Sequence, residues 1–116
     1  MNNHNTITPL FNGVIFMQLN STKVDFEGQP GEIKFGYNNE GYIDKVRIFG
    51  PIIPGGYIFY DYDFNDHNRP KYHNFPKHNN AHKHVYTIIN GITVNRTTEE
   101  LTEYEYNTYI KPYLNN

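Results

Sequence analysis

The segment YIFYDYDFNDHNRPKYHNFPKHNNAHKHVYTII, residues 57–89, determines the fold expected for the chain. Its two ends, residues 57–64 and 85–89, are rich in the aromatic and β-branched residues that favour strands. Between them, residues 67–84 hold five of the six histidines, with four fixed positive charges and no negative charge. A segment this polar cannot bury itself, so the flanking strands must impose its conformation. The sequence therefore predicts a histidine-rich loop, residues 65–84, held between two strands.

Alternation within the two strands assigns their polar side chains to faces. Asp61 and Asp63 share one face of the first strand, because successive side chains of a strand point to opposite sides. His82 and His84 share one face of the second strand in the same way, with Lys83 opposite. We expect the carboxylates to lie beside the histidine-rich loop.

Strand signals also lie outside this segment. Short apolar or alternating runs separated by turn residues predict further strands and two hairpins, at residues 13–19, 22–26, 33–37 and 42–49. Two prolines and three glycines in residues 50–56 predict a loop. Asn90-Gly91 is the strongest hairpin signal of the chain and leads into a last strand at residues 92–95.

The end of the chain predicts one helix. Thr97 followed by Glu100 fits a capping box at its start, and Pro112 is expected to end it after Lys111. Aromatic and apolar residues recur at helical spacing, so one face of the helix should pack on the sheet. These residues are Leu101, Tyr104, Tyr106, Tyr109, Ile110 and Tyr113. The chain as a whole predicts a single α+β domain, residues 1–116: an antiparallel sheet of about six strands, a hairpin meander, covered by one C-terminal helix.

Composition excludes several classes of function. The 116 residues include no cysteine, which excludes thiol catalysis, disulfides and thiolate zinc sites. No stretch approaches the roughly 20 apolar residues that span a bilayer, and residues 1–6 do not resemble a signal peptide. We therefore expect a cytoplasmic protein that does not contact a membrane. A basic loop in a chain of net charge −2 favours a local anion site over a general DNA-binding surface.

One interpretation of the loop is a metal site. His82 and His84 point the same way, and Asp61 or Asp63 could complete a nitrogen and oxygen shell for zinc or another divalent metal. The His-x-His spacing also occurs in strands without a metal. A second interpretation is that the histidines are ordinary polar loop residues. In that case no cofactor is expected.

A third interpretation, which we favour, is acid–base chemistry on a phosphodiester without a cofactor. Imidazole has a pKa near 6.5, so it can act as base or acid at neutral pH. The candidate catalytic pair is His82 and His84. Alternative members of the pair are His67, His73 and His78.

Cations and aromatic residues of the segment suit an RNA or nucleotide ligand. Arg69 is the best phosphate clamp, because its planar guanidinium binds two oxygens at once. Looser attraction comes from Lys71, Lys77 and Lys83. The candidates for stacking on unpaired bases are Tyr60, Tyr62, Tyr72 and Tyr86.

The chain resembles small bacterial and phage toxin-like domains in three places: Asp-His-Asn-Arg-Pro-Lys-Tyr-His at residues 66–73, Asn-Asn-Ala-His-Lys-His-Val at residues 79–85, and Asn-Gly at residues 90–91. Such domains include the short TumE-type toxins of toxin–antitoxin pairs and the C-terminal domains of polymorphic toxins. The resemblance extends over residues 57–114. It implies a small ribonuclease held by an antidote or immunity protein. The histidines that match the shared pattern are His67, His73, His82 and His84.

This chain departs from the pattern at one point. The compact Pro-His-x-His of the toxin-like domains is interrupted, because residues 77–81 separate Pro76 from His82. The role of each histidine therefore stays open. We predict a toxin-like ribonuclease with histidine catalysis. The alternative is a phage or bacterial binding protein that sequesters a nucleotide or another anion, or inhibits a host protein, and either one is compatible with a homo-oligomer.

Overall fold

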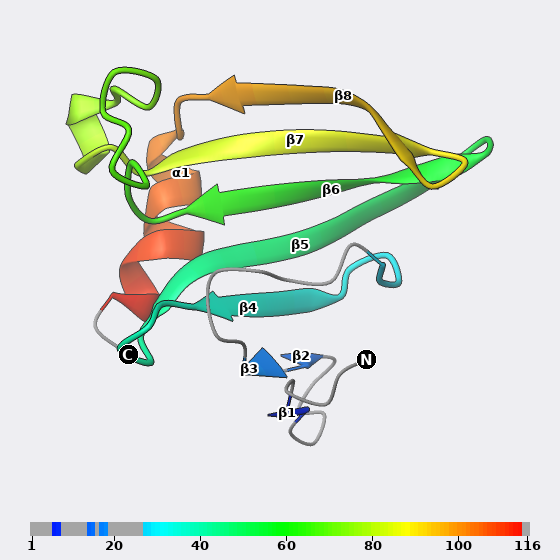
Figure 1. Cartoon of the computed structure of the whole chain (residues 1–116), viewed down its shortest axis with the longest axis horizontal. Coiled ribbons are helices and arrows are strands. Elements are labelled where there is room, and N and C mark those ends of the chain that lie inside the picture. The colour runs from blue at the N-terminus through cyan, green and yellow to red at the C-terminus, as the bar shows by residue number, and fades with distance from the viewer. Residues whose placement is uncertain (1–5, 8–13, 16, 19–26, 115–116) are drawn as a thin grey trace.

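The computed structural model describes residues 6–7, 14–15, 17–18 and 27–114. Within them the fold is of the α+β class, a meander of antiparallel strands with a short helical segment after it (Figure 1). Each strand of the meander pairs with the next one along the chain. The strands are β4 (Ile33–Tyr37), β5 (Ile43–Ile53), β6 (Gly56–Asp63), β7 (His82–Ile89) and β8 (Ile92–Glu99).

The antiparallel sheet thus has five strands, not the six expected. The two-residue β2 (Val14–Ile15) also joins the sheet, at the edge of β4, but it runs parallel to β4. β1 (Thr6–Ile7) and β3 (Met17–Gln18) form a separate antiparallel pair. Most of the hairpin expected from residues 13–19 and 22–26 lies outside the described residues.

The prediction of a loop at residues 50–56 is wrong, because β5 continues to Ile53 and β6 begins at Gly56. The β5–β6 register shifts between Phe49 and Ile52, so Pro51 sits in a bulge. Pro51 also lies beyond the part of β5 that pairs with β4. A proline is tolerated there, because its missing N–H breaks no regular ladder bond.

Gly56 lies where the sheet leaves no room for a side chain. A Cβ atom at this position would lie 1.7 Å from the carbonyl oxygen of Ile88 and 2.7 Å from its carbonyl carbon. Both are backbone atoms of β7 and cannot turn aside as a side chain can. Only glycine is compatible with this register.

The helical segment begins later than expected. Thr97 and Glu100 do not form its capping box, because Thr97 pairs with Val85 in the β7–β8 ladder. The capping box is formed instead by Thr102 and Glu105, each accepting the backbone N–H of the other. The segment consists of α1 (Glu103–Glu105), a π-helical turn (Tyr106–Ile110) and a 3-10 turn (Lys111–Tyr113). Pro112 lies inside this last turn, so the prediction that it ends the helix after Lys111 is wrong.

Each face of the sheet has its own hydrophobic cluster. The face under the helical segment buries the larger one: Phe35, Val46, Tyr62, Ala81, Leu101 and Ile110. The expected packing is confirmed for Tyr106, Tyr109 and Tyr113, which lie against this cluster, whereas Tyr104 is 70% exposed. The opposite face buries a smaller cluster of Phe49, Phe59 and Ile88.

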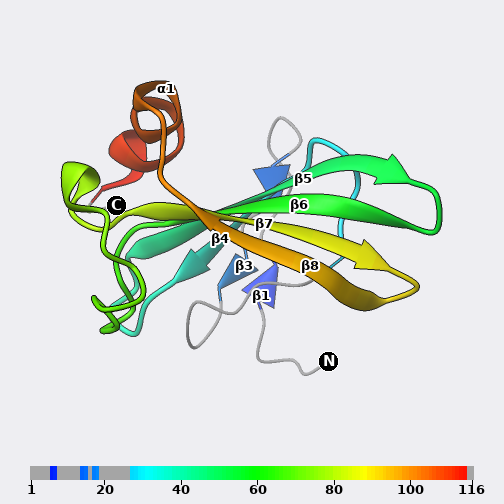
Figure 2. The ribbon, with the colours of Figure 1, turned by 90° about the horizontal axis from the view of Figure 1, so that it is seen from above.

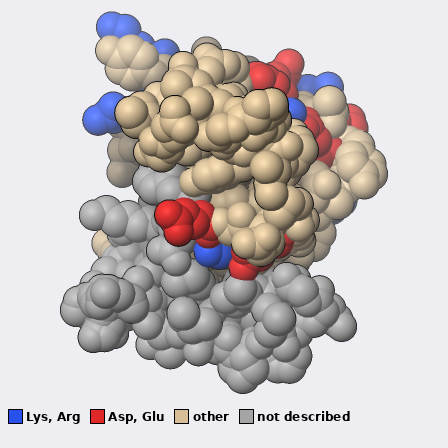
Figure 3. Space-filling model, turned by 90° about the vertical axis from the view of Figure 1, so that its right-hand side faces the viewer, with Lys and Arg blue, Asp and Glu red and all other residues tan. Residues whose placement is uncertain are grey.

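The helical segment covers only one end of the sheet (Figure 2). That end also carries the connection from β6 to β7, whereas the β5–β6 and β7–β8 turns lie at the other end (Figure 1). The turn end shows mainly residues without formal charge in the described part of its surface (Figure 3). The described helical turns have neither the length nor the apolar composition of a membrane-spanning helix.

Candidate functional site

Two carboxylates and two imidazoles are buried side by side on the sheet face opposite the helical segment. The β6–β7 register pairs Asp61 with His84 and Asp63 with His82. Each of the four residues is at most 1% exposed. The shared faces expected from strand alternation are confirmed by this register.

The connection between β6 and β7, residues 64–81, begins with tight turns built by its own polar side chains. The side chains of Asn65 and Asp66 accept the backbone N–H groups of His67 at 2.8 Å and Asn68 at 2.9 Å, respectively. His67 and Asn68 both adopt a left-handed backbone conformation, with φ of 54° and 61°. These turns bring the His67 ring back toward β6.

Asn80 closes the same connection at its other end. Its side-chain amide donates to the carboxylate of Asp66 at 3.1 Å, and its side-chain oxygen accepts the N–H of Phe75 at 2.7 Å. Asn79 and Asn80 also have left-handed φ values, 55° and 67°, which asparagine tolerates better than most residues. The asparagines of this segment therefore shape the loop that carries His73.

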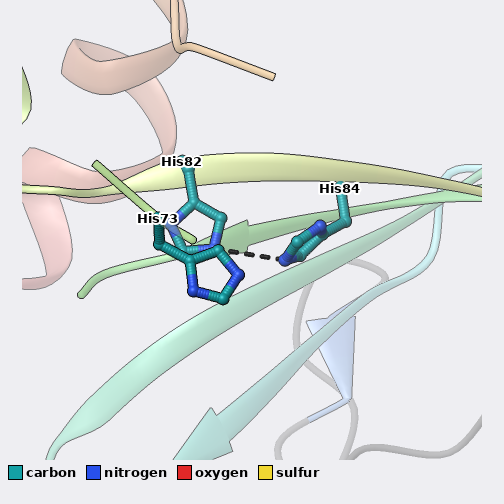
Figure 4. A group of neighbouring side chains, drawn as sticks. All are labelled: His73, His82 and His84. Atoms are coloured by element: carbon teal, nitrogen blue, oxygen red, sulfur yellow. Dashed lines mark hydrogen bonds between the residues drawn. The ribbon is translucent and has the colours of Figure 1, made fainter. Parts of the chain in front are cut away.

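Three imidazole nitrogens surround one carboxylate oxygen. Asp63 Oδ2 lies 2.9 Å from His67 Nε2, 3.3 Å from His84 Nε2 and 3.5 Å from His82 Nε2. The Nε2 atoms of His82 and His84 are 3.1 Å apart. The His73 ring stacks on that of His82, with centroids 4.4 Å apart, and meets His84 edge-on (Figure 4). We call these five side chains the histidine cluster.

In three of the four imidazoles, Nδ1 is within hydrogen-bond distance of a backbone carbonyl oxygen. The pairs are His82 with Asn80 (2.8 Å), His84 with Thr97 (3.1 Å) and His73 with Asp66 (3.2 Å). A carbonyl oxygen can only accept, so each of these Nδ1 atoms carries a proton. In the neutral ring Nε2 then keeps its lone pair. Arg96, which can only donate, lies 3.2 Å from Nε2 of His84 and agrees with this tautomer.

Asp61 is held by cations from β5. Its carboxylate accepts hydrogen bonds from Arg47, at 2.5 Å from Nε and 2.7 Å from Nη2, and from Lys45 at 2.9 Å. Lys45 also lies 3.2 Å from Asp63 Oδ1, the oxygen turned away from the imidazoles. Asp61 therefore balances buried positive charge, and Asp63 is the carboxylate that faces the histidines.

The cluster favours an ionised carboxylate. Burial raises the pKa of Asp63, but the surrounding imidazoles of His67, His82 and His84 outweigh burial and hold the pKa well below its usual range. Burial and the neighbouring His82 lower the pKa of His73. Burial also raises the pKa of Asp44 to about 6, although His67 opposes the shift.

A groove with a volume of about 440 Å³ opens beside the cluster, lined by Arg69, Tyr72, His73, Arg96 and Thr98. Arg69 and Tyr72 come from the β6–β7 connection, and Arg96 and Thr98 from β8. His73 belongs both to this lining and to the histidine cluster. The groove thus joins two guanidinium groups to an imidazole.

Arg96 was not expected at the site. A two-residue turn at Asn90-Gly91 with regular pairing would put Tyr86 opposite Asn95 and turn Arg96 to the other face. The β7–β8 register shifts between Thr87 and Ile88, and this bulge pairs Tyr86 with Arg96 instead. The sequence carries the arginine but no signal for the bulge.

Several residues expected at the site lie on the helix-covered face. Tyr60 packs there beside the core, and the other three have specific partners. Tyr62 stacks on Tyr109, Lys83 donates to Glu105 at 2.6 Å, and His78 stacks on Tyr106. These residues are therefore turned away from the groove.

Three further expected residues lie outside the groove lining. Lys71 and Lys77 are exposed in the β6–β7 connection, and Lys77 lies 3.7 Å from Glu103. Tyr86 is on the same face as the cluster but stacks on Phe59, with ring centroids 4.5 Å apart. Its hydroxyl accepts a hydrogen bond from Arg96 Nε at 2.9 Å.

Comparison with protein-family models, with curated proteins and with solved structures finds no match for this chain. The chemistry of the site therefore has to follow from its own geometry.

Proposed function

We propose that the protein is a small ribonuclease that cleaves phosphodiester bonds in single-stranded RNA. The observation that carries this proposal is the groove, because it combines groups that bind a phosphate with a group that accepts a proton. Its volume of about 440 Å³ falls in the usual range of small-molecule sites, about 300–1,000 Å³. The resemblance of residues 57–114 to toxin-like domains supports the same activity.

Arg69 and Arg96 are the phosphate-binding residues of the proposal. A guanidinium presents its donors in a planar fork that matches two oxygens of a phosphate. The two arginines come from different elements, so a phosphate between them would be held from two directions. Hydrogen-bond contacts with Tyr86 and His84 position Arg96 before a ligand arrives.

His73 is the proposed general base. Its Nδ1–H donates to the Asp66 carbonyl, so Nε2 has a lone pair available. Nε2 takes the proton of the ribose 2′-hydroxyl, and the 2′-oxygen forms a bond to the adjacent phosphorus. The bond from phosphorus to the 5′-oxygen breaks, and water in the open groove protonates the leaving oxygen. The products are a 2′,3′-cyclic phosphate and a 5′-hydroxyl, and His73 then releases its proton to solvent.

Tyr72 supplies an aromatic surface at the groove. Its side chain is 70% exposed, unlike Tyr62 and Tyr86, which stack on other aromatic rings. Stacking an unpaired base on such a ring contributes about 1–3 kcal/mol and tolerates any base. The proposed substrate is therefore a single strand rather than a duplex.

Incubation of the purified protein with labelled single-stranded RNA, followed by mass spectrometry of the products, tests the proposal. Wild-type protein should release fragments with 2′,3′-cyclic phosphate ends. His73→Ala should lower the cleavage rate by about 100-fold or more, because general base catalysis is lost. Arg69→Ala and Arg96→Ala should each weaken RNA binding by about 10-fold, because a charge-assisted contact is removed.

Lys111→Ala is the matched control, since it removes an exposed cation from the helical segment, outside the groove. It should cleave at the wild-type rate. Equal cleavage of DNA of the same sequence would contradict a mechanism through the 2′-hydroxyl. RNA that binds to the wild-type protein but is never cleaved would identify a binding protein without turnover.

A further inference from the structure

We infer that Asp63, His82 and His84 form a binding site for one divalent transition metal, and that zinc is the ion that fits it best. None of the three residues lines the groove, and none has a role in the proposed reaction. All three are at most 1% exposed. Burial of a carboxylate and two imidazoles costs free energy unless partners or an ion compensate for the lost water.

The separations of the three facing atoms match the edges of a tetrahedron around zinc. Zinc binds imidazole nitrogen and carboxylate oxygen at about 2.0–2.1 Å, which places neighbouring ligand atoms about 3.3–3.4 Å apart. In the protein, His82 Nε2 and His84 Nε2 are 3.1 Å apart, and Asp63 Oδ2 lies 3.3 Å from His84 Nε2 and 3.5 Å from His82 Nε2. The site needs little rearrangement to accept the ion.

The protonation states of these residues also require a cation between them. Nδ1 of His82 and of His84 each donates to a backbone carbonyl, so in the neutral rings both Nε2 atoms present lone pairs. Asp63 Oδ2 adds a carboxylate oxygen to the same place, 3.3 Å from His84 Nε2 and 3.5 Å from His82 Nε2. Three lone pairs that converge within 3.5 Å repel one another unless a proton or a metal ion lies among them.

The surroundings of the imidazoles are those of metal ligands. A ligating histidine commonly donates its second ring N–H to a carbonyl oxygen, which fixes the tautomer and the orientation of the ring. His82 and His84 both do so here. Nitrogen and carboxylate ligands without thiolates suit zinc and its neighbours in the first transition series.

Two further imidazoles flank the three ligands: His67, whose Nε2 lies 2.9 Å from Asp63 Oδ2, and His73 at the groove. His73 can bring one ring nitrogen within 4.8 Å of those of His82 and His84. It stacks on His82 rather than pointing at the same centre as the other two. Three protein ligands with a position left for water or substrate characterise catalytic rather than structural zinc sites.

Arg96 and Lys45 are cations beside the site, and Lys45 lies 3.2 Å from the far oxygen of Asp63. Nη2 of Arg96 lies 3.2 Å from His84 Nε2, the same atom that would bind the metal. The Arg96 side chain is exposed, so it can turn toward the groove when an ion enters. When the Arg96 side chain turns away, Nε2 of His84 becomes free to bind the ion. The guanidinium of Arg96 then lies closer to a bound phosphate.

The role of the metal rests on the proposed ribonuclease function, but its binding does not. An ion bound by Asp63, His82 and His84 beside the groove would act as a Lewis acid and polarise a phosphate oxygen. Binding of zinc without any RNA cleavage would contradict the proposed function and leave the metal site standing. RNA cleavage by a protein that binds no zinc would contradict the metal site and leave the proposed function standing.

Titration of the wild-type protein with zinc, after treatment with EDTA and its removal, is the first test. Calorimetry should show one ion per chain. Long-range proton–nitrogen NMR spectra should show zinc-induced shifts at Nε2 of His82 and His84, with Nδ1 still protonated. Cobalt in place of zinc should give the intense visible bands of a four-coordinate ion. An unchanged spectrum, in which one of these imidazoles carries protons on both nitrogens, would identify the cation as a proton and overturn the inference.

Variants then separate the ligands from their neighbours. His84→Ala should lower zinc affinity by about 100-fold or more, as expected for the loss of a ligand. His78→Gln is the matched control, because it replaces a histidine on the opposite face, where that ring stacks on Tyr106. Arg96→Ala should bind zinc more tightly than wild type, since it removes a competing cation. Equal affinity of all three variants would contradict the assigned ligands, whatever happens to the fold of any single one.

Discussion

At the scale of single residues, Asp61 and Asp63 show how two identical side chains on one strand face acquire different roles. Asp61 is held by Arg47 and Lys45 from β5. Asp63 lies two residues further along β6 and meets three imidazoles. Strand alternation predicts their shared face, but the partners come from neighbouring strands. Sequence alone therefore left Asp61 and Asp63 as equivalent candidates.

Asp61→Asn should destabilise the protein by about 3–5 kcal/mol, because it removes the buried carboxylate charge that Arg47 and Lys45 share. Urea unfolding, monitored by circular dichroism, measures the loss. Lys77→Ala is the control, since Lys77 and its neighbour Glu103 are 60% and 63% exposed. Removing such a surface pair should change stability by less than about 0.5 kcal/mol. A similar loss in both variants would contradict a special role for the buried pair.

His73 and Arg96 mark the limit of what residue types reveal about the site. The sequence marks His73 as a candidate because it is one of the histidines of the histidine-rich segment. Its position at the groove depends on turns that asparagine side chains build. Arg96 reaches the same groove only because of a bulge in β7–β8. Both placements are set by backbone irregularities, which follow from the folded structure rather than from spacing along the chain.

At the scale of elements, the start of the helical segment was the least predictable boundary. The sequence offers two similar capping patterns, Thr97 to Glu100 and Thr102 to Glu105. Pairing of Thr97 with Val85 extends β8 through the first pattern and leaves the second to begin the helix. A tertiary contact between strands decides between two local signals of equal strength. Element types were thus predictable here, and their limits were not.

Glu105 joins the helical segment to β7 and should make stability depend on pH. Burial raises the pKa of Glu105, but the hydrogen bond from Lys83 and those from Thr102 lower it below its usual value. A carboxylate with a lowered pKa in the folded protein stabilises the fold above its unfolded pKa. That contribution is lost as the pH falls through the folded pKa.

Glu105→Gln should therefore cost about 1 kcal/mol at pH 7, and the difference from wild type should shrink below about pH 4. Urea unfolding of both proteins across this pH range measures the effect. Glu103→Gln, in the same turn but 63% exposed, should show no comparable pH dependence. A constant difference at every pH would indicate that packing, rather than charge, accounts for the loss.

At the scale of the whole molecule, the sheet separates a packing face from a polar face. The helical segment and the larger hydrophobic cluster occupy one side, and the histidine cluster the other. The meander of β4–β8 was predictable, because turn residues and alternating runs mark successive strands. The number of antiparallel strands was not, since short apolar runs near the start of the chain have no period that distinguishes their pairing.

Zinc bound at the inferred site should raise the thermal stability of the whole molecule. An ion that binds only the folded chain stabilises it by about 2.7 kcal/mol when its free concentration is 100 times the dissociation constant. For a chain of 116 residues this corresponds to a rise in Tm of about 10 °C. Differential scanning calorimetry with zinc and with magnesium compares the two ions. An equal rise with magnesium would contradict a site built mainly of imidazoles.

The close approach of Gly56 to β7 limits how this protein can evolve. Most surface positions can change while the sheet persists, but any other residue at position 56 would have to displace the backbone at Ile88. Position 56 therefore has to remain glycine for as long as the β6–β7 register is kept. Gly56 is also at the opposite end of β6 from Asp63, so replacing every histidine of the cluster would leave this steric constraint unchanged.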